Sequence, residues 1–109
     1  MKLAIIGSRT LTNIALEQYV MKDVTEIVSG GAVGVDRCAA EYAKSKGIKL
    51  TEFYPDYERY GRAAPIIRNK KIVDYADAVI AFWDGKSKGT LAVIKYSQKT
   101  GKVCKIIGC

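Results

Sequence analysis

The stretch Ser29-Gly30-Gly31-Ala32-Val33-Gly34-Val35-Asp36-Arg37 lies between a short apolar run, Thr25 to Val28, and an amphipathic segment, Val35 to Lys46. The run predicts a buried strand, and the segment predicts a helix that ends at Gly47. Glycines in such a turn accept positive φ values and let a ligand approach the backbone closely. The first turn of the helix supplies free N–H groups and the positive end of its dipole. The stretch therefore predicts a site for phosphate or another anion.

Apolar runs and helical segments alternate along the whole chain. Strands are expected at 2–6, 25–28, 48–54, 78–82 and 102–107. Helices are expected from Thr10 or Thr12 to about Met21, at 35–46, at 65–75 and from Gly89 or Thr90 to Gly101, with an ordered loop at 57–63.

This alternation predicts a parallel sheet with helices on both faces. Right-handed crossovers make it a doubly wound, Rossmann-like α/β fold, for which we expect five strands in the order 3-2-1-4-5. The length of 109 residues suits one such domain, residues 1–109. No apolar run approaches the roughly 18–20 residues that cross a bilayer, so we expect a cytoplasmic protein without a membrane partner.

Composition limits the chemistry that is open to the chain. Because the sequence has no histidine, His-based zinc sites and Ser–His or Cys–His nucleophiles are excluded. The three cysteines have no paired spacing and indicate neither a disulfide framework nor a metal site, and we expect no cofactor. The net charge of +7 suits solvated lysines and also favours polyanions, so nucleic acid stays open as a partner.

The loops that follow the strands of a parallel sheet meet at its carboxyl edge, where ligands bind. Here these loops are Gly7-Ser8-Arg9, the glycine stretch with Asp36, and Trp83-Asp84-Gly85 followed by Lys88-Gly89-Thr90. Together they predict one polar pocket. The expected ligand-binding residues are Gly7, Ser8, Arg9, Gly30, Gly31, Ala32, Gly34, Asp36, Arg68, Asn69, Trp83, Gly89 and Thr90.

Several of these residues also have a purely structural interpretation. Asp36 either complements the dipole in the first turn of a helix or accepts hydrogen bonds from a ribose. Arg9 is either a solvated charge or a forked donor to a phosphate. Thr90 either begins a helix or helps to form a second anion site. Trp83 either belongs to the core or stacks on a base.

The segment Arg68-Asn69-Lys70-Lys71 is typical of a solvated basic face, but Asn69 shares a helix face with Ile66 and Val73 by its spacing. The glycine stretch itself has the spacing Gly-Gly-x-x-Gly-x-Asp. It therefore lacks both the Gly-Lys-Ser/Thr ending of a P-loop and the G-x-G-x-x-G pattern of dinucleotide-binding dehydrogenases.

Four motifs in chain order resemble the SLOG superfamily: Gly7-Ser8-Arg9, Ser29 to Asp36, Arg68-Asn69 and Gly89-Thr90. This Rossmann-like group includes the lonely-guy phosphoribohydrolases, the DNA-processing protein A and the molybdenum-cofactor-carrier-like proteins, and the nearest likeness is to its small YspA-like branch. The resemblance implies a nucleotide or nucleotide-derived ligand at the carboxyl edge. It also implies phosphate contacts from Gly30, Gly31 and Gly34, with Ser8, Arg9, Asp36, Asn69 and Thr90 around the pocket.

The chain departs from the phosphoribohydrolases at one motif. Those enzymes carry Pro-Gly-Gly-x-Gly-Thr followed closely by a catalytic Glu, whereas Lys88-Gly89-Thr90 has no Pro-Gly-Gly and residues 91–94 contain no Glu. Their catalytic group therefore does not carry over, and Asp36 and Asp84 stand as the candidate catalytic carboxylates.

Three functions remain open at this point. The first is binding of a nucleotide or nucleotide-derived phosphorylated ligand by a sensor or carrier module. The second is hydrolysis of an N-glycosidic or phosphate bond of a nucleotide. The third is binding of single-stranded nucleic acid, which the net charge and the group Tyr54, Tyr57 and Tyr60 favour. Relatives in the superfamily often pair, which implies a homodimer.

Overall fold

The computed structural model describes residues 1–109 and contains one sheet of five parallel strands. Its strands are β1 (Lys2–Gly7), β2 (Glu26–Ser29), β3 (Lys49–Glu52), β4 (Ala78–Trp83) and β5 (Val103–Gly108). Their order across the sheet is β3-β2-β1-β4-β5, and every neighbouring pair is parallel. The predicted fold class and strand order are therefore confirmed.

The helices are α1 (Val35–Lys46), α2 (Tyr57–Tyr60), α3 (Ala64–Tyr75) and α4 (Lys88–Lys99), with 3-10 turns η1 (Leu16–Gln18) and η2 (Gly61–Ala63). α1 ends, as predicted, at Gly47, which has a φ of 67°. α3 carries Pro65 in its first turn, where the missing N–H has no intrahelical partner to lose. None of these helices combines the length and the hydropathy that a membrane span requires.

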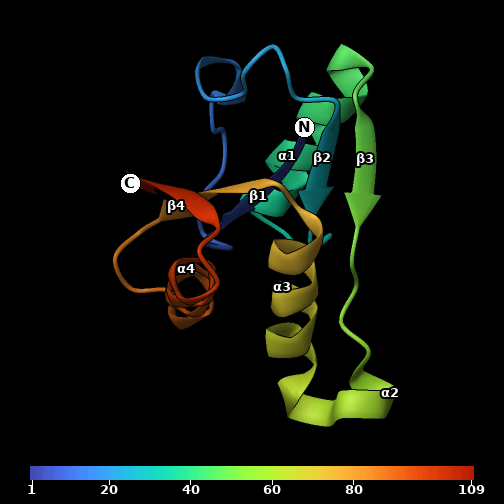
Figure 1. Cartoon of the computed structure of the whole chain (residues 1–109), viewed down its shortest axis with the longest axis vertical. Coiled ribbons are helices and arrows are strands. Elements are labelled where there is room, and N and C mark those ends of the chain that lie inside the picture. The colour runs from blue at the N-terminus through green and yellow to red at the C-terminus, as the bar shows by residue number, and fades with distance from the viewer.

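Two hydrophobic layers hold the helices against the sheet. On one face, Val35, Ala39 and Ala43 of α1 pack against residues such as Ile5 and Phe82. The opposite face is covered by α3 and α4, whose buried apolar residues include Ile72, Val73 and Val93. Figure 1 shows α3 and α4 on the same side of the sheet, below the strands in this view.

The prediction of a helix from Thr10 or Thr12 to Met21 is wrong. Only the 3-10 turn η1 forms there, and Asn13 adopts a left-handed φ of 57°. Thr and Asn side chains compete for backbone hydrogen bonds and disfavour a helix interior. The apolar residues of this segment still cover the face that α1 leaves open, because Leu11, Ile14, Leu16, Tyr19 and Val20 pack on the same core cluster.

Two further expectations fail between β3 and α3. Residues 57–63 are not a loop, because α2 and η2 form there; the carboxylate of Asp56 caps α2 by accepting a hydrogen bond from the Arg59 N–H at 3.2 Å. The expected apolar row of α3 is also wrong, since Ile66 is 53% exposed. The face that turns inward instead contains Arg68, Ile72 and Val73.

Gly7 provides a test of how tightly β1 meets α1. A Cβ atom at Gly7 would lie 2.5 Å from Cγ2 of Val35 and 2.8 Å from the carbonyl oxygen of Phe82. Because a backbone oxygen cannot move aside, we expect Gly7→Ala to lower the free energy of unfolding by about 1–3 kcal/mol. Urea unfolding at neutral pH measures this change.

Gly89→Ala is the matched control, since a Cβ at Gly89 would meet nothing within 4 Å. Gly89 lies in the first turn of α4, so alanine should leave the stability unchanged or raise it by up to about 1 kcal/mol. An equal loss in both variants would contradict the packing described here.

Candidate functional site

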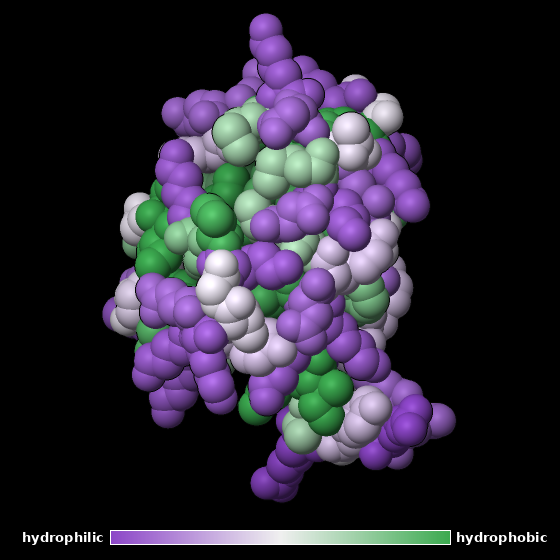
Figure 2. All heavy atoms as spheres, in the orientation of Figure 1, coloured by the Kyte–Doolittle hydropathy of each residue, from purple (hydrophilic) through white to green (hydrophobic).

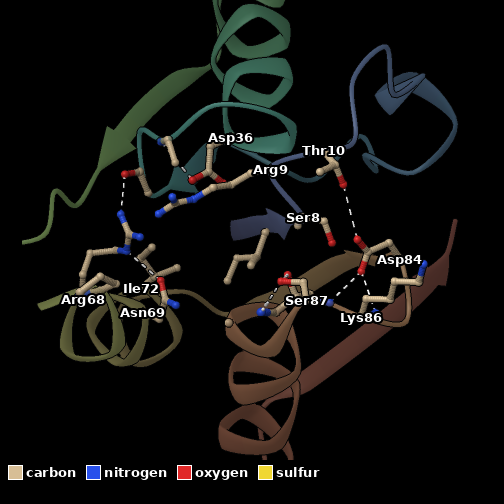
Figure 3. A pocket seen from close by; sticks show the side chains of 17 residues that line it. Ser8, Arg9, Thr10, Asp36, Arg68, Asn69, Ile72, Asp84, Lys86 and Ser87 are labelled. Atoms are coloured by element: carbon tan, nitrogen blue, oxygen red, sulfur yellow. Dashed lines mark hydrogen bonds between the residues drawn. The ribbon is translucent and has the colours of Figure 1, made fainter. Parts of the chain in front are cut away.

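A polar pocket of about 440 Å3 opens at the carboxyl edge of the sheet, between the N-terminal ends of α1 and α4 and one side of α3 (Figure 3). Three loops that follow strands reach it, as the topology requires. Its lining residues are Ile6, Gly7, Ser8, Arg9, Thr10, Gly30, Ala32, Asp36, Pro65, Arg68, Asn69, Ile72, Asp84, Lys86, Ser87, Gly89 and Thr90.

Most of the residues expected to bind a ligand lie together in this pocket. They are Gly7, Ser8, Arg9, Gly30, Ala32, Asp36, Arg68, Asn69, Gly89 and Thr90, and the candidate catalytic residue Asp84 joins them. The structure does not bring Gly31, Gly34 or Trp83 to the pocket lining. The pocket is also lined by six residues that were not predicted: Ile6, Thr10, Pro65, Ile72, Lys86 and Ser87.

The glycines of the loop after β2 make room for neighbouring side chains and backbone. A Cβ at Gly31 would lie 2.4 Å from the ring of Tyr54, and one at Gly34 would lie 2.5 Å from the carbonyl oxygen of Arg9. Both glycines also have positive φ values, 69° and 78°. These contacts explain why neither residue faces the pocket: their open sides are filled by other parts of the chain.

Gly30 occupies the space between two charged side chains. A Cβ there would lie 2.7 Å from Nη1 of Arg68 and 2.9 Å from Oδ2 of Asp36. Any larger residue would push apart the guanidinium and the carboxylate that form this end of the pocket. The glycine thus serves the site indirectly, by letting α3 and α1 bring opposite charges close to each other.

Arg68 is 8% exposed and Asn69 is half-buried, so the alternative of a solvated basic face holds only for Lys70 and Lys71. Its Nη1 donates to the carbonyl oxygen of Gly30 at 2.6 Å and to that of Phe53 at 3.3 Å. Its Nε donates to Oδ1 of Asn69 at 2.7 Å, which leaves the Asn69 amide nitrogen free to donate into the pocket. Burial lowers the pKa of Arg68, while the nearby charge of Asp36 raises it.

Asp36 is 8% exposed and lies in the first turn of α1. Its Oδ2 accepts a hydrogen bond from the Ala32 N–H at 3.1 Å. Burial raises the pKa of the carboxyl, and the Ala32 hydrogen bond and the charge of Arg68 oppose this shift only in part. The hydroxyl of Ser29 lies close by without forming a hydrogen bond. A buried carboxyl with a raised pKa is a group that can exchange a proton with a ligand.

The opposite end of the pocket suits an anion. The first-turn N–H groups of Lys88 and Gly89 have no intrahelical acceptor, and the positive end of the α4 dipole lies at the same end of the helix. Ser8 lies in the middle of the pocket (Figure 3), is 2% exposed, and its hydroxyl has no hydrogen-bond partner in the chain. The nearby carboxylate of Asp84, whose pKa the Ser8 hydroxyl helps to lower, forms no hydrogen bond with it, so this buried hydroxyl is able to donate one to a ligand.

Asp84 shapes the loop that precedes α4. Its Oδ1 accepts hydrogen bonds from the N–H groups of Lys86 and Ser87, both at 2.8 Å, and its Oδ2 accepts one from the Thr10 hydroxyl at 3.4 Å. The two backbone hydrogen bonds lower the pKa of the carboxyl. Trp83 fixes the same loop, because its indole N–H donates to the carbonyl of Ser87 at 3.0 Å. Asp84 and Trp83 therefore both have a structural role, since they hold the loop that precedes α4.

Two charged residues of the pocket repel each other. Figure 3 shows the side chain of Arg9 extending toward Arg68, and its charge lowers the pKa of Arg68. Arg9 is exposed and forms neither an ion pair nor a side-chain hydrogen bond. No group of three or more His, Cys, Asp or Glu side chains lies close enough together to hold a metal ion.

The raised pKa of Asp36 predicts how stability depends on pH. Between the unfolded value of about 3.8 and the higher folded value, the folded state binds more protons, so stability falls as pH rises through this range. In Asp36→Asn this dependence is absent. We therefore expect the free energy of unfolding of the variant, relative to the wild type, to increase from pH 3 to pH 7 in urea titrations. A difference that stays constant or shrinks with pH would contradict the burial of a charged Asp36.

Comparison with known proteins gives one match. The model of the family described as YspA, cpYpsA-related SLOG matches residues 1–60, a range that holds β1, β2, the glycine loop, α1 and β3. No curated protein and no solved structure matches the chain. The matched range covers more than half of the 109 residues. On this evidence the chain belongs to the YspA, cpYpsA-related SLOG family.

Proposed function

We propose that this protein binds a nucleotide or a nucleotide-derived phosphorylated ligand at the carboxyl edge of its sheet, as a sensor or carrier module. Membership in a SLOG family is compatible with such a ligand. The observation that carries the proposal is the buried and unpartnered hydroxyl of Ser8, which faces the same pocket as the N-terminal end of α4.

The phosphate occupies the end of the pocket formed by Ser8 and the first turn of α4. Its oxygens accept hydrogen bonds from the Ser8 hydroxyl and from the free N–H groups of that turn, and the helix dipole favours its charge. Gly89 has no side chain and nothing within 4 Å of its Cβ position, so an anion can approach the helix end closely. Hydrogen bonds to a charged acceptor are the stronger kind.

The positive charges of Arg9 and Arg68 support an anionic ligand in a second way. The pKa of Arg68 is lowered first by burial and also by the charge of Arg9, while the charge of Asp36 opposes this shift only in part. An anion that enters the pocket relieves the repulsion between Arg9 and Arg68 and gains the attraction of both. The guanidinium of Arg9 has no partner within the chain and is therefore able to reach a phosphate without breaking another contact.

The ribose fits the other end, between Asp36 and Asn69. Oδ1 of Asp36 has no hydrogen-bond donor in the chain, and the amide nitrogen of Asn69 has no acceptor. A ribose hydroxyl is able to donate a hydrogen bond to the Asp36 carboxylate and to accept one from the Asn69 amide. The polar lining thus matches a phosphate at one end of the ligand and hydroxyls at the other.

Ser8→Ala separates binding from folding. Because it removes a buried hydroxyl without a partner, the free energy of unfolding should stay the same or rise by about 1 kcal/mol. The affinity for adenosine 5′-monophosphate should fall by about 10- to 100-fold, since a hydrogen bond to a charged acceptor is lost. Isothermal titration calorimetry with adenosine 5′-monophosphate measures this, and adenosine, which lacks the phosphate, should bind both forms equally weakly.

Ser29→Ala provides the matched control. Ser29 also has a fully buried, unpartnered hydroxyl, but it does not line the pocket. Its replacement should have the same small effect on stability. Because its hydroxyl lies beside Asp36, away from the phosphate end, it should lower the affinity for adenosine 5′-monophosphate much less than Ser8→Ala does. Equal affinities in the wild type and Ser8→Ala, or no binding of the nucleotide by the wild type, would overturn the proposal.

We also infer a second candidate function, hydrolysis of an N-glycosidic or phosphate bond of the same ligand, and one observation favours it. The buried carboxyl of Asp36 has a raised pKa and faces the pocket, so it is able to accept a proton from water or to stabilise a ribosyl cation. Asp84 is less suited, because its pKa is lowered and its oxygens hold a loop.

Chromatography of adenosine 5′-monophosphate and ADP-ribose after incubation with the protein tests this second function. Hydrolysis should release free base or phosphate with the wild type and not with Asp36→Asn, while the variant still binds the nucleotide. Intact substrates after prolonged incubation with a protein that binds them would exclude hydrolysis and leave the binding function.

A further inference from the structure

The segment between β3 and α3 extends beyond the carboxyl ends of the strands and carries exposed aromatic side chains. Tyr54 is 66% exposed and Tyr57 is 57% exposed, and Ile66 at the start of α3 is 53% exposed. Figure 1 shows α2 at the lower end of the molecule, well past the end of β3. In Figure 2 this end carries apolar atoms among strongly hydrophilic ones.

The exposed charged groups at this end are four cations and two carboxylates, those of Asp56 and Glu58. Arg59 and Arg62 are exposed on α2 and η2, and Lys70 and Lys71 are exposed on α3. The ring of Tyr60 lies 5.4 Å from the guanidinium of Arg59 and 5.7 Å from the Nζ of Lys71, so it holds both cations near the exposed rings. We call the group Tyr54, Tyr57, Tyr60, Arg59, Arg62 and Lys71 the tyrosine surface.

The tyrosine surface is continuous with the pocket through Arg68. A small cavity of about 60 Å3 between the segment after β3, α2 and α3 includes Tyr54, Tyr60 and Lys71 in its lining, together with Arg68, which also lines the main pocket. The ring of Tyr54 also fills the space beside Gly31.

The main pocket itself offers no aromatic ring to a base, since its lining contains no Phe, Tyr or Trp. The nearest exposed rings are those of the tyrosine surface, on the outer side of Arg68. Rings that stack bases, interleaved with cations that contact phosphates, are the combination by which proteins hold single-stranded nucleic acid. More cations are present than the phosphate of a single nucleotide needs.

We propose that a single-stranded oligonucleotide binds with its terminal phosphorylated nucleotide in the pocket and its next nucleotides on the tyrosine surface. This inference rests on the proposed binding of a nucleotide in that pocket. Tyr54 and Tyr57 stack on the bases outside the pocket, and Arg59, Arg62 and Lys71 contact the linking phosphates. The exposed cations at this end outnumber Asp56 and Glu58, and their mixture with exposed rings favours a polyanion over an apolar protein partner.

Calorimetry with ligands of two lengths tests the proposal. The probes are adenosine 5′-monophosphate and tetra-adenylates of DNA and of RNA, each with a 5′- or a 3′-terminal phosphate. We expect at least one phosphorylated tetra-adenylate to bind about tenfold more tightly than the mononucleotide, because it adds stacking and phosphate contacts. Its affinity should also fall more steeply with salt.

Variants at Tyr57 assign the gain to the tyrosine surface. Tyr57→Ala should reduce the affinity for that tetra-adenylate to about that of the mononucleotide and leave mononucleotide binding unchanged. Tyr57→Phe keeps a stacking ring and should bind like the wild type. Met21→Ala removes an equally exposed large side chain, also 57% exposed, and should change neither affinity.

The possible outcomes separate the two proposals. If the mononucleotide binds and no tetra-adenylate binds more tightly, the inference about the tyrosine surface is overturned, while nucleotide binding in the pocket stands. A protein partner for the tyrosine surface predicts this result. Equal losses of both ligands in Tyr57→Ala, or no loss of either, also overturn it. If the mononucleotide itself fails to bind, the proposed function is overturned as well.

Discussion

The hydrogen bond from the Arg68 guanidinium to the carbonyl oxygen of Gly30, 2.6 Å long, holds together the end of the site that contains Asp36 and Asn69. It ties α3, which comes late in the chain, to the loop that follows β2. The same guanidinium also binds the carbonyl of Phe53, and through it the segment that leaves β3. A buried arginine that donates to backbone carbonyls keeps its charge without an ion pair within 4 Å, so the charge remains available to a ligand.

The parallel topology places the loop after β2, which this hydrogen bond joins to α3, beside those after β1 and β4, and the resulting pocket has two ends. Because β1, β2 and β4 are neighbours and run in the same direction, their following loops open into one pocket. One end combines the Ser8 hydroxyl with the N-terminus of α4 and suits a phosphate. The other combines the carboxylate of Asp36 with the amide of Asn69 and suits neutral hydroxyl groups.

The sequence is sufficient to predict the strands, their order, and the loops that meet at the carboxyl edge, because alternating apolar runs and right-handed crossovers leave few topologies. It fails for the segment after β1, where Asn13 takes a left-handed φ and apolar residues reach the core without a helix. Helix propensity there is too weak to decide between a helix and packing of single residues on the sheet.

The site is predicted less well than the fold, because the burial and contacts of its residues depend on distant parts of the chain. Nothing local marks Arg68 as buried within a run of four polar residues, because its burial depends on Gly30 and Phe53 elsewhere in the chain. The roles of Gly31 and Gly34 are also set by distant partners, Tyr54 and Arg9. Asp56 and Ser87 are missed features with a local signal, since a capping Asp or Ser indicates the start of a helix.

The most direct test of this account is a map of backbone amide chemical shifts when adenosine 5′-monophosphate or adenosine is added to the isotope-labelled protein. We expect the nucleotide to produce its largest shifts at Ser8, Arg9, Gly89 and Thr90, around the unpartnered hydroxyl and the start of α4, and adenosine to leave these amides nearly unchanged. Shifts that are equal for the two ligands, or that cluster at the amino ends of the strands, would contradict a phosphate site at the carboxyl edge.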